Sequence, residues 1–200
     1  MEGIKFRPLR ADEIEVRQGS TGSGFISLLL YKTARTDTIL LNETVGNENW
    51  TNDIKVIGGN LWSGIGIWNE DRGDYTWKWS VGTESNVEKV KGEDSDSFKR
   101  AGYRWGIGIE LYTSPTIRVW ANKGHYTPKS DGKGTWDTFR VASIEYDGLG
   151  HITKLSIANT SSNKLVFTYG YADKEDVITA INEEKSRKEE IIEHLRNQES

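Results

Sequence analysis

The chain has 200 residues, no cysteine and a formal net charge of −4 at pH 7. A chain of this length fits one domain, or one domain with an appendage, and it can bury a core without covalent staples. The lack of cysteine excludes a disulfide framework and a thiolate metal site, and the three histidines lie far apart with no metal-ligand spacing.

The first predicted elements are a strand and a short helix. Residues 25–31 (FISLLLY) form an apolar run after a Gly/Ser-rich turn, which is typical of a buried strand. Residues 34–46 predict a helix that Thr36 or Asp37 caps at its start and that Gly46 ends. We expect the inward-facing side chains of this helix to be Ile39, Leu40 and Val45.

A meander of three strands and a long helix follow. The strands are predicted over residues 53–57, 60–68 and 75–81. Gly64 and Gly66 lie inside the second strand and indicate the close approach of another element. The helix is predicted over residues 85–105, because apolar residues recur there at steps of three and four. They are Val87, Val90, Phe98, Ala101 and Trp105.

The second half of the chain predicts further strands, a polar loop and a charged final helix. The strands are expected at 116–120, 136–146, 152–158 and 164–169, the loop at 121–135 and the helix at 173–198. The order of elements predicts an α+β fold, in which an antiparallel sheet packs on a long helix and extra strands and a C-terminal helix are added.

A cluster of cations ends the long predicted helix, in the stretch GEDSDSFKRAGYRWGIG (residues 92–108). At about 100° per residue, three cations and a tyrosine lie opposite the apolar face. These residues are Lys99, Arg100, Tyr103 and Arg104.

Two interpretations of this cluster are open. Acidic residues precede the cations, so the charge order suits the helix dipole and gives solvated pairs such as Asp96 with Lys99 or Arg100. A tyrosine between cations also suits nucleic acid, because a phenol ring can stack on a base. Composition alone favours the first interpretation.

The sequence gives little support for catalysis. The nearest match to a phosphate-binding loop, residues 132–135, lacks the Ser or Thr that must follow the lysine. Zinc-protease and nucleophile-elbow motifs are missing, and the carboxylates form no acid/base pattern. We expect no enzyme activity, no catalytic residue, no metal and no cofactor. Without a secretory signal or a long apolar run, we also expect a cytoplasmic protein with no membrane partner.

Residues 15–112 resemble the phage single-strand annealing proteins (recombinases) of the Rad-fifty-two-like superfamily, which include the Sak, Erf and Red-beta types. The stretches that carry the resemblance are LRADEIEVR, SLLLYKTAR, TVGNENW and WSVGTESNVEKVKGEDSDSFKRAGYRWGIGIELYTSP. The run from GTES through FKRA to WGIG is the most specific of them. Residues 118–200 contribute little to the resemblance.

The resemblance implies a fold and a function. It implies a β-β-β-α core that assembles side by side into rings or helical filaments, with single-stranded DNA in a basic groove and its bases exposed. The implied activity is ATP-independent annealing of complementary strands in phage recombination and repair, in the bacterial host cytoplasm. A single-strand binding protein is a further candidate partner. We expect an annealing core over residues 1–120, a loop and additional strands over 121–171, and a charged helix over 172–200.

The resemblance also implies which residues contact DNA. Arg17 matches an arginine early in the first strand, and Arg35 matches a basic residue near the short helix. Arg104 is shifted by one position from an expected arginine, and Ile109 stands where another arginine is expected. The predicted set is Arg17, Tyr31, Lys32, Arg35, Lys99, Arg100, Tyr103 and Arg104.

Two other functions stay open at this point. A β-rich structural or scaffold component of a virion would explain the tryptophans and the acidic tail, but it would not need the cations on one helix face. A sequence-tolerant binder that protects single strands without annealing them would share those cations. A gel shift separates the first alternative from DNA binding, and an annealing assay separates the second.

The tail differs in charge from the rest of the chain. Residues 172–200 carry nine acidic and five basic side chains, whereas the remaining residues are neutral overall. Lysines at the core positions of its heptads oppose a homodimeric coiled coil. Apolar residues near both ends predict a helix that docks at its ends, and the alternative is a frayed helix that contacts nothing. The apolar residues are Val177, Ile181, Ile191 and Leu195.

Overall fold

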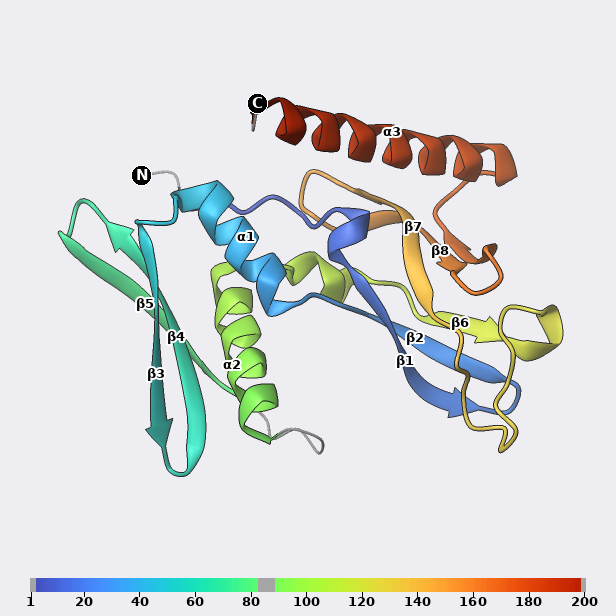
Figure 1. Cartoon of the computed structure of the whole chain (residues 1–200), viewed down its shortest axis with the longest axis horizontal. Coiled ribbons are helices and arrows are strands. Elements are labelled where there is room, and N and C mark those ends of the chain that lie inside the picture. Colours follow the sequence, from blue (N-terminus) through green and yellow to red (C-terminus); the bar gives the residue numbers. More distant parts are fainter. Residues whose placement is uncertain (1–2, 83–88, 199–200) are drawn as a thin grey trace. The chain divides into compact units, whose positions relative to one another are not determined.

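Two antiparallel β-sheets and three α-helices form an α+β fold in the computed structural model, which describes residues 3–82 and 89–198 (Figure 1). The predicted fold class is confirmed at this level. The chain divides into two compact units, one of residues 1–9 and 32–109 and one of residues 10–31 and 110–200. We call them the first unit and the second unit.

The first unit is a three-stranded meander with one helix before it and one after it. Its elements are α1 (Ala34–Val45), β3 (Trp50–Ile57), β4 (Asn60–Asn69), β5 (Asp74–Val81) and α2 (Lys89–Trp105). Gly58 and Gly59 both have positive φ, as the two-residue hairpin turn between β3 and β4 requires. α2 packs against β4 and β5 (Figure 1). The predicted start of this helix falls on residues 83–88, which lie outside the described residues.

One face of the three-stranded sheet is covered by α2. Trp50 of β3 pairs with Ile67 of β4, and its ring lies 6.2 Å from that of Phe98 in α2. Ile65 and Ile67 are buried on this face because the helix excludes water from them. The alternation of β4 therefore sends its buried isoleucines toward α2.

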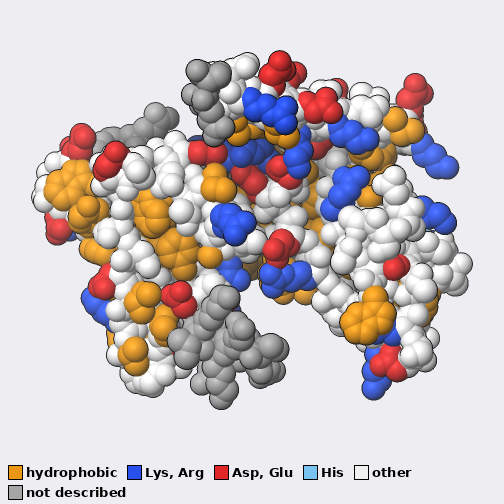
Figure 2. All heavy atoms as spheres, viewed as in Figure 1, with side chains coloured by type: hydrophobic (Ala, Val, Ile, Leu, Met, Phe, Trp, Pro, Cys, Tyr) orange, Lys and Arg blue, Asp and Glu red, His pale blue; other side chains and the backbone are white. Residues whose placement is uncertain are grey.

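The opposite face of this sheet carries a row of aromatic side chains. We call Trp68, Tyr75, Trp77 and Trp79 the aromatic row. Successive ring centroids along the row are 5.2, 6.1 and 5.5 Å apart. A Cβ on Gly64 would lie 2.6 Å from the Trp79 ring, and a Cβ on Gly66 would lie 2.9 Å from the Trp77 ring. The close approach predicted at these glycines thus comes from rings of the next strand. Hydrophobic side chains gather over this sheet in Figure 2.

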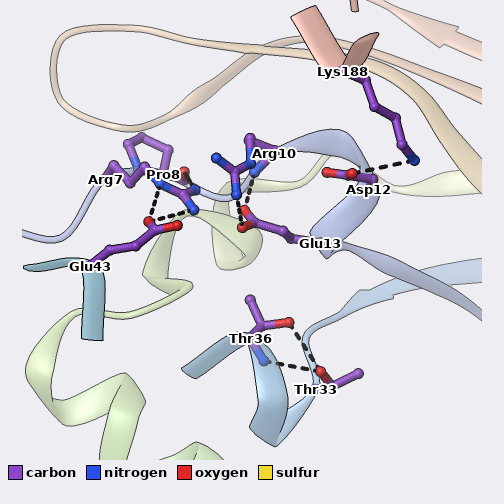
Figure 3. A network of polar contacts seen from close by, with 9 residues as sticks. All are labelled: Arg7, Pro8, Arg10, Asp12, Glu13, Thr33, Thr36, Glu43 and Lys188. Carbon is purple, nitrogen blue, oxygen red and sulfur yellow. Dashed lines mark hydrogen bonds and ion pairs between the residues drawn. The ribbon is translucent and has the colours of Figure 1, made fainter. Parts of the chain in front are cut away.

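The start of α1 differs from the prediction. Thr33 is the N-cap, and its hydroxyl accepts a hydrogen bond from the Thr36 backbone N–H at 3.2 Å (Figure 3). Thr36 and Asp37, the predicted caps, are buried inside the first turn instead. Ile39 was expected to face inward and is exposed, whereas Leu40 and Leu41 are fully buried. Packing against α2 and β3, which local sequence does not encode, selects this face of α1.

The second unit contains a six-stranded antiparallel sheet. Its elements are η1 (Ala11–Glu13), β1 (Glu15–Gly22), β2 (Phe25–Tyr31), η2 (Ile109–Thr113, at the unit boundary), β6 (Ile117–Trp120), η3 (Ala121–Lys123), β7 (Phe139–Tyr146), β8 (Ile152–Asn159), β9 (Lys164–Tyr169) and α3 (Lys174–Gln198). The strand order is β6-β2-β1-β7-β8-β9, and the two edge strands also contact each other, so the sheet curls. Its core includes Ile26, Leu28, Val119, Leu155 and Ile157, all buried.

The division into units differs from the predicted boundary at residue 120. Val16 of β1 pairs with Phe139 of β7, and Ile26 of β2 pairs with Val119 of β6. Residues 10–31 and 110–120 therefore belong with the later strands. Pairing between strands so distant in sequence leaves no local pattern, which is why periodicity did not indicate it.

The loop predicted over residues 121–135 has structure of its own. It begins with η3 and contains a β-bridge between Pro128 and Thr135. The Thr135 backbone N–H donates to the Gln18 side chain of β1 at 3.1 Å, and Tyr126 is buried. The loop is thus held against the sheet of the second unit.

Helix α3 docks by its first turns. Val177 and Ala180 of these turns are buried where α3 packs against β7. Further along the helix, the Lys188 amine lies 3.4 Å from the Asp12 carboxylate (Figure 3). The second apolar patch, which contains Ile191 and Leu195, is exposed. Docking is therefore confirmed for the first predicted patch alone. Across the part of the chain that the structure describes, no helix is both long enough and apolar enough to span a membrane.

Candidate nucleic-acid interface

Helix α2 presents the four residues predicted for its last turns on the side away from the sheet. They are Lys99, Arg100, Tyr103 and Arg104, which we call the α2 cation face. Arg100 and Arg104 are exposed, and Lys99 and Tyr103 are half-buried. Ile109, which stands where the resemblance implies a further arginine, is also exposed. The predicted opposition of an apolar and a cationic side is confirmed.

The buried side of α2 fixes the direction of this face. Ala101 is fully buried, and the Trp105 indole Nε1–H donates to the backbone carbonyl of Ile65 at 2.9 Å. Near the start of the helix, the Glu93 carboxylate accepts from the Leu61 backbone N–H at 2.7 Å. Contacts to β4 near both ends of the helix prevent it from rotating about its axis.

One of the predicted ion pairs on α2 is present. Arg100 Nε lies 2.8 Å from the Asp96 carboxylate, four residues earlier. An exposed pair at this spacing contributes about 0.3–0.5 kcal/mol. A phosphate can therefore replace Asp96 as the partner of Arg100 at low cost, so the pair does not prevent anion binding.

Arg35 lies in the first turn of α1, in the same unit as the α2 cation face. Its side chain is exposed, and it makes no ion pair with any residue of the described ranges. The start of a helix carries a partial positive charge from unpaired N–H groups. Arg35 and this helix end together suit an anion.

Lys32 has a different role from the predicted one. It is buried, and its amine forms an ion pair with Asp37 and donates to the backbone carbonyl of Lys99 at 3.2 Å. A cation in this position cannot reach a phosphate without leaving its partner buried and unpaired, which is strongly unfavourable. The structure therefore removes Lys32 from the predicted DNA contacts.

Burial also changes the acidity of Asp37. Its side chain has no exposed surface, and desolvation raises its pKa from 3.8 to about 6, while the positive charges of Lys32 and Lys99 oppose the rise. The folded protein thus holds a carboxyl group beneath α2 whose pKa lies close to physiological pH.

Arg17 and Tyr31 lie in the second unit, on adjacent strands. The Arg17 guanidinium lies 5.0 Å from the centroid of the Tyr31 ring, and its Nε donates to Glu15 at 2.9 Å. Tyr31 is 38% exposed, on the face of β2 opposite the buried Ile26 and Leu28. Tyr31 is therefore not a core residue, and its contact with DNA stays a prediction. The same holds for a composite groove, since these two residues and the α2 cation face belong to different units.

Comparison of the chain with known protein families, curated proteins and solved structures found no match.

Two lysines of the first unit were not among the predicted site residues. The Lys78 amine lies 4.3 Å from the Trp105 ring centroid and donates to the Arg104 carbonyl at 2.8 Å. The Lys55 amine lies 4.1 Å from the Trp79 ring centroid. Strand alternation indicates the sheet face that carries each lysine, but the ring contact depends on pairing between strands.

Within residues 3–82 and 89–198, no three metal-binding side chains gather in one place.

Proposed function

We propose that the protein binds single-stranded DNA through the α2 cation face and anneals complementary strands without ATP. The observation that carries the proposal is this face itself. Three cations and a tyrosine point away from the sheet on a helix whose other side is anchored to it. Cations suit phosphates and a phenol ring suits a base, which is the combination that single-stranded nucleic acid requires.

Two further points support the annealing function over other kinds of DNA binding. The pattern GTES…FKRA…WGIG, on which the resemblance to annealing proteins rests, includes the α2 cation face. The first unit also has three antiparallel strands followed by a long helix, the element order implied for an annealing core. Contacts to phosphates rather than base edges would give no sequence preference and would leave bases free to pair.

Self-assembly into a ring or filament is part of the proposal. Within the described chain, β3 and β5 each pair with β4 alone, so the outer edge of each has backbone groups without a strand partner. Such edges are templates for pairing with another chain. Joining β3 of one copy to β5 of the next would align many weak DNA sites along one strand and so raise the overall affinity.

The aromatic row supports a second candidate, a structural component of an assembly, because uncovered aromatic faces mark interaction surfaces. A gel shift with a labelled oligonucleotide separates the two candidates. Mixing complementary oligonucleotides without ATP then separates annealing from protection of single strands. We expect a shift that weakens with salt, and faster duplex formation than in buffer. Absence of any shift would exclude DNA binding, and a shift without annealing would leave a single-strand binder.

A further inference from the structure

The pair of Lys32 and Asp37 occupies a pocket shaped by two glycines of the first unit. A Cβ on Gly102 would lie 2.5 Å from the nearer Asp37 carboxylate oxygen. A Cβ on Gly108 would lie 2.5 Å from Cδ of Lys32, and φ at Gly108 is +75°. A larger residue at either position would displace the pair, so the pocket has room for these two side chains only because both neighbours are glycine.

Lys32 connects this pocket to the α2 cation face. Its amine donates at 3.2 Å to the backbone carbonyl of Lys99, the first residue of that face. The same amine forms the ion pair with Asp37. One buried cation thus contacts both the carboxylate below the helix and the backbone of a residue proposed to bind phosphate.

Asp37 has acceptor capacity left over. Its Oδ2 is buried, and it has no hydrogen-bond partner among the residues that the structure describes. The positive charge of Lys99 already acts on this carboxylate, and the Lys99 amine has no ion pair within the described ranges. A buried acceptor without a partner is unfavourable, so Asp37 competes with outside anions for the Lys99 amine.

We propose that Lys32 is a positioning residue that satisfies Asp37 and thereby keeps the Lys99 amine available to a phosphate. The phosphate half of this inference rests on the proposed function, whereas the effect on Lys99 does not. Removal of the Lys32 amine leaves the carboxyl group without its buried partner and raises its pKa further, so the effect is expected at alkaline pH, where the group is still ionised. Lys99, the other cation whose charge acts on this carboxylate, then turns inward.

This mechanism predicts that a substitution at Lys32 turns Lys99 inward and that a second substitution, at Asp37, reverses this change. Lys32→Met frees the carboxylate and withdraws Lys99. Adding Asp37→Asn to the same background removes the negative charge, so Lys99 turns outward again. A purely structural role also predicts that the double variant recovers stability, because no unpaired charge stays buried. It does not predict lower Lys99 reactivity in Lys32→Met, since loosening of α2 would raise that reactivity.

The first test does not involve DNA. The full-length protein and both variants are treated with limiting acetylating reagent at alkaline pH, where Asp37 is ionised, and the reactivity of the Lys99 amine is measured by peptide mass spectrometry relative to exposed Lys185. We expect the reactivity to fall several-fold in Lys32→Met and to recover in the double variant. Equal reactivity in all three folded proteins would overturn the inference. If Lys32→Met does not fold, Lys32→Gln, which keeps a donor for Asp37 but no charge, takes its place with the same expected order.

The second test measures binding to an oligothymidine across a range of salt concentrations. Losing one phosphate contact reduces the salt slope per subunit by about 0.7 for single strands. We expect this reduction in Lys32→Met and in Lys99→Ala, and no further reduction when the two are combined. Additive reductions would contradict the inference. Failure of the unaltered protein to bind would refute the proposed function alone, because the labelling result stands without DNA.

Discussion

Helices α2 and α3 both carry many charges, but they arrange them differently. In α3, Arg187 lies 3.6 Å from Glu184 of the same helix and Lys188 lies 3.4 Å from Asp12 of η1, so both cations have an acidic partner. In α2, the cation face follows a run of acids, and of its three cations only Arg100 makes an ion pair, with Asp96, within the described residues. The proposed anion site is therefore distinguished from α3 by cations without an acidic partner on an anchored face, and not by the number of cations.

The largest effect should come from removing cations from α2. We expect Lys99→Ala with Arg100→Ala to lower the affinity for single-stranded DNA by about 100-fold or more, because two charged contacts are lost in each subunit. Lys185→Ala with Arg187→Ala removes the same charge from α3 and should leave the affinity almost unchanged. Fluorescence anisotropy with a labelled oligonucleotide measures both. Equal losses in the two variants would mean that net charge, not the α2 cation face, governs binding.

A pH titration of stability tests the raised pKa of Asp37, which is buried beneath α2. The folded-state pKa of Asp37 is about 6, above the unfolded value of 3.8, so between these values the folded state binds more protons. The free energy of unfolding should therefore decrease as the pH rises from 4 to 7, by on the order of 3 kcal/mol from this group. Urea denaturation at each pH measures it.

The matched control for that titration is Asp37→Asn, which cannot ionise and should lack this decrease. The lowered pKa values of His125, Asp147 and Asp176 act in the opposite direction, but these groups are present in both proteins, so the difference between the two titrations isolates Asp37. A decrease of the same size in Asp37→Asn would show that another group causes it.

Gly102→Ala tests how closely α2 fits over the buried pair. The added methyl group would lie 2.5 Å from Asp37, and overpacking of this kind costs about 1–3 kcal/mol. Gly148→Ala is the control, because a Cβ there would meet nothing within 4 Å. Chemical denaturation compares the two variants. Unchanged stability in Gly102→Ala would show that the pocket has more room than the structure indicates.

The smallest expected effect on DNA binding comes from deleting α3. Truncation after Tyr171 should keep the affinity for single strands, because every predicted contact lies within residues 17–104. It should lower the stability of the second unit by about 2 kcal/mol, because Val177 and Ala180 lose their packing against β7. Truncation after Ile181 keeps those turns and should leave both properties unchanged. A folded protein without α3 that no longer binds DNA would place the site elsewhere.

The sequence predicted the elements better than their grouping. Residues 25–31 and 164–169 are strands with the predicted bounds, because alternation and turn residues act locally. The two units could not be predicted, since they depend on pairing of β1 with β7 and of β2 with β6.

The candidate site shows the same limit. Helical periodicity was enough to place Arg100 and Arg104 on the exposed side of α2. Lys32 looked equivalent to Arg35 in the sequence, three residues away, yet its amine is buried against Asp37. Nothing local distinguishes these two cations, because the pocket is completed by Gly102 and Gly108 about seventy residues later.

Photo-crosslinking of an oligothymidine to the full-length protein, followed by peptide mass spectrometry, identifies the surface that contacts DNA. We expect crosslinks in the α2 peptide that contains Tyr103, the tyrosine of the α2 cation face, and their loss in Lys99→Ala with Arg100→Ala. Crosslinks confined to α3 or to the aromatic row, unchanged in that variant, would contradict the proposed DNA interface.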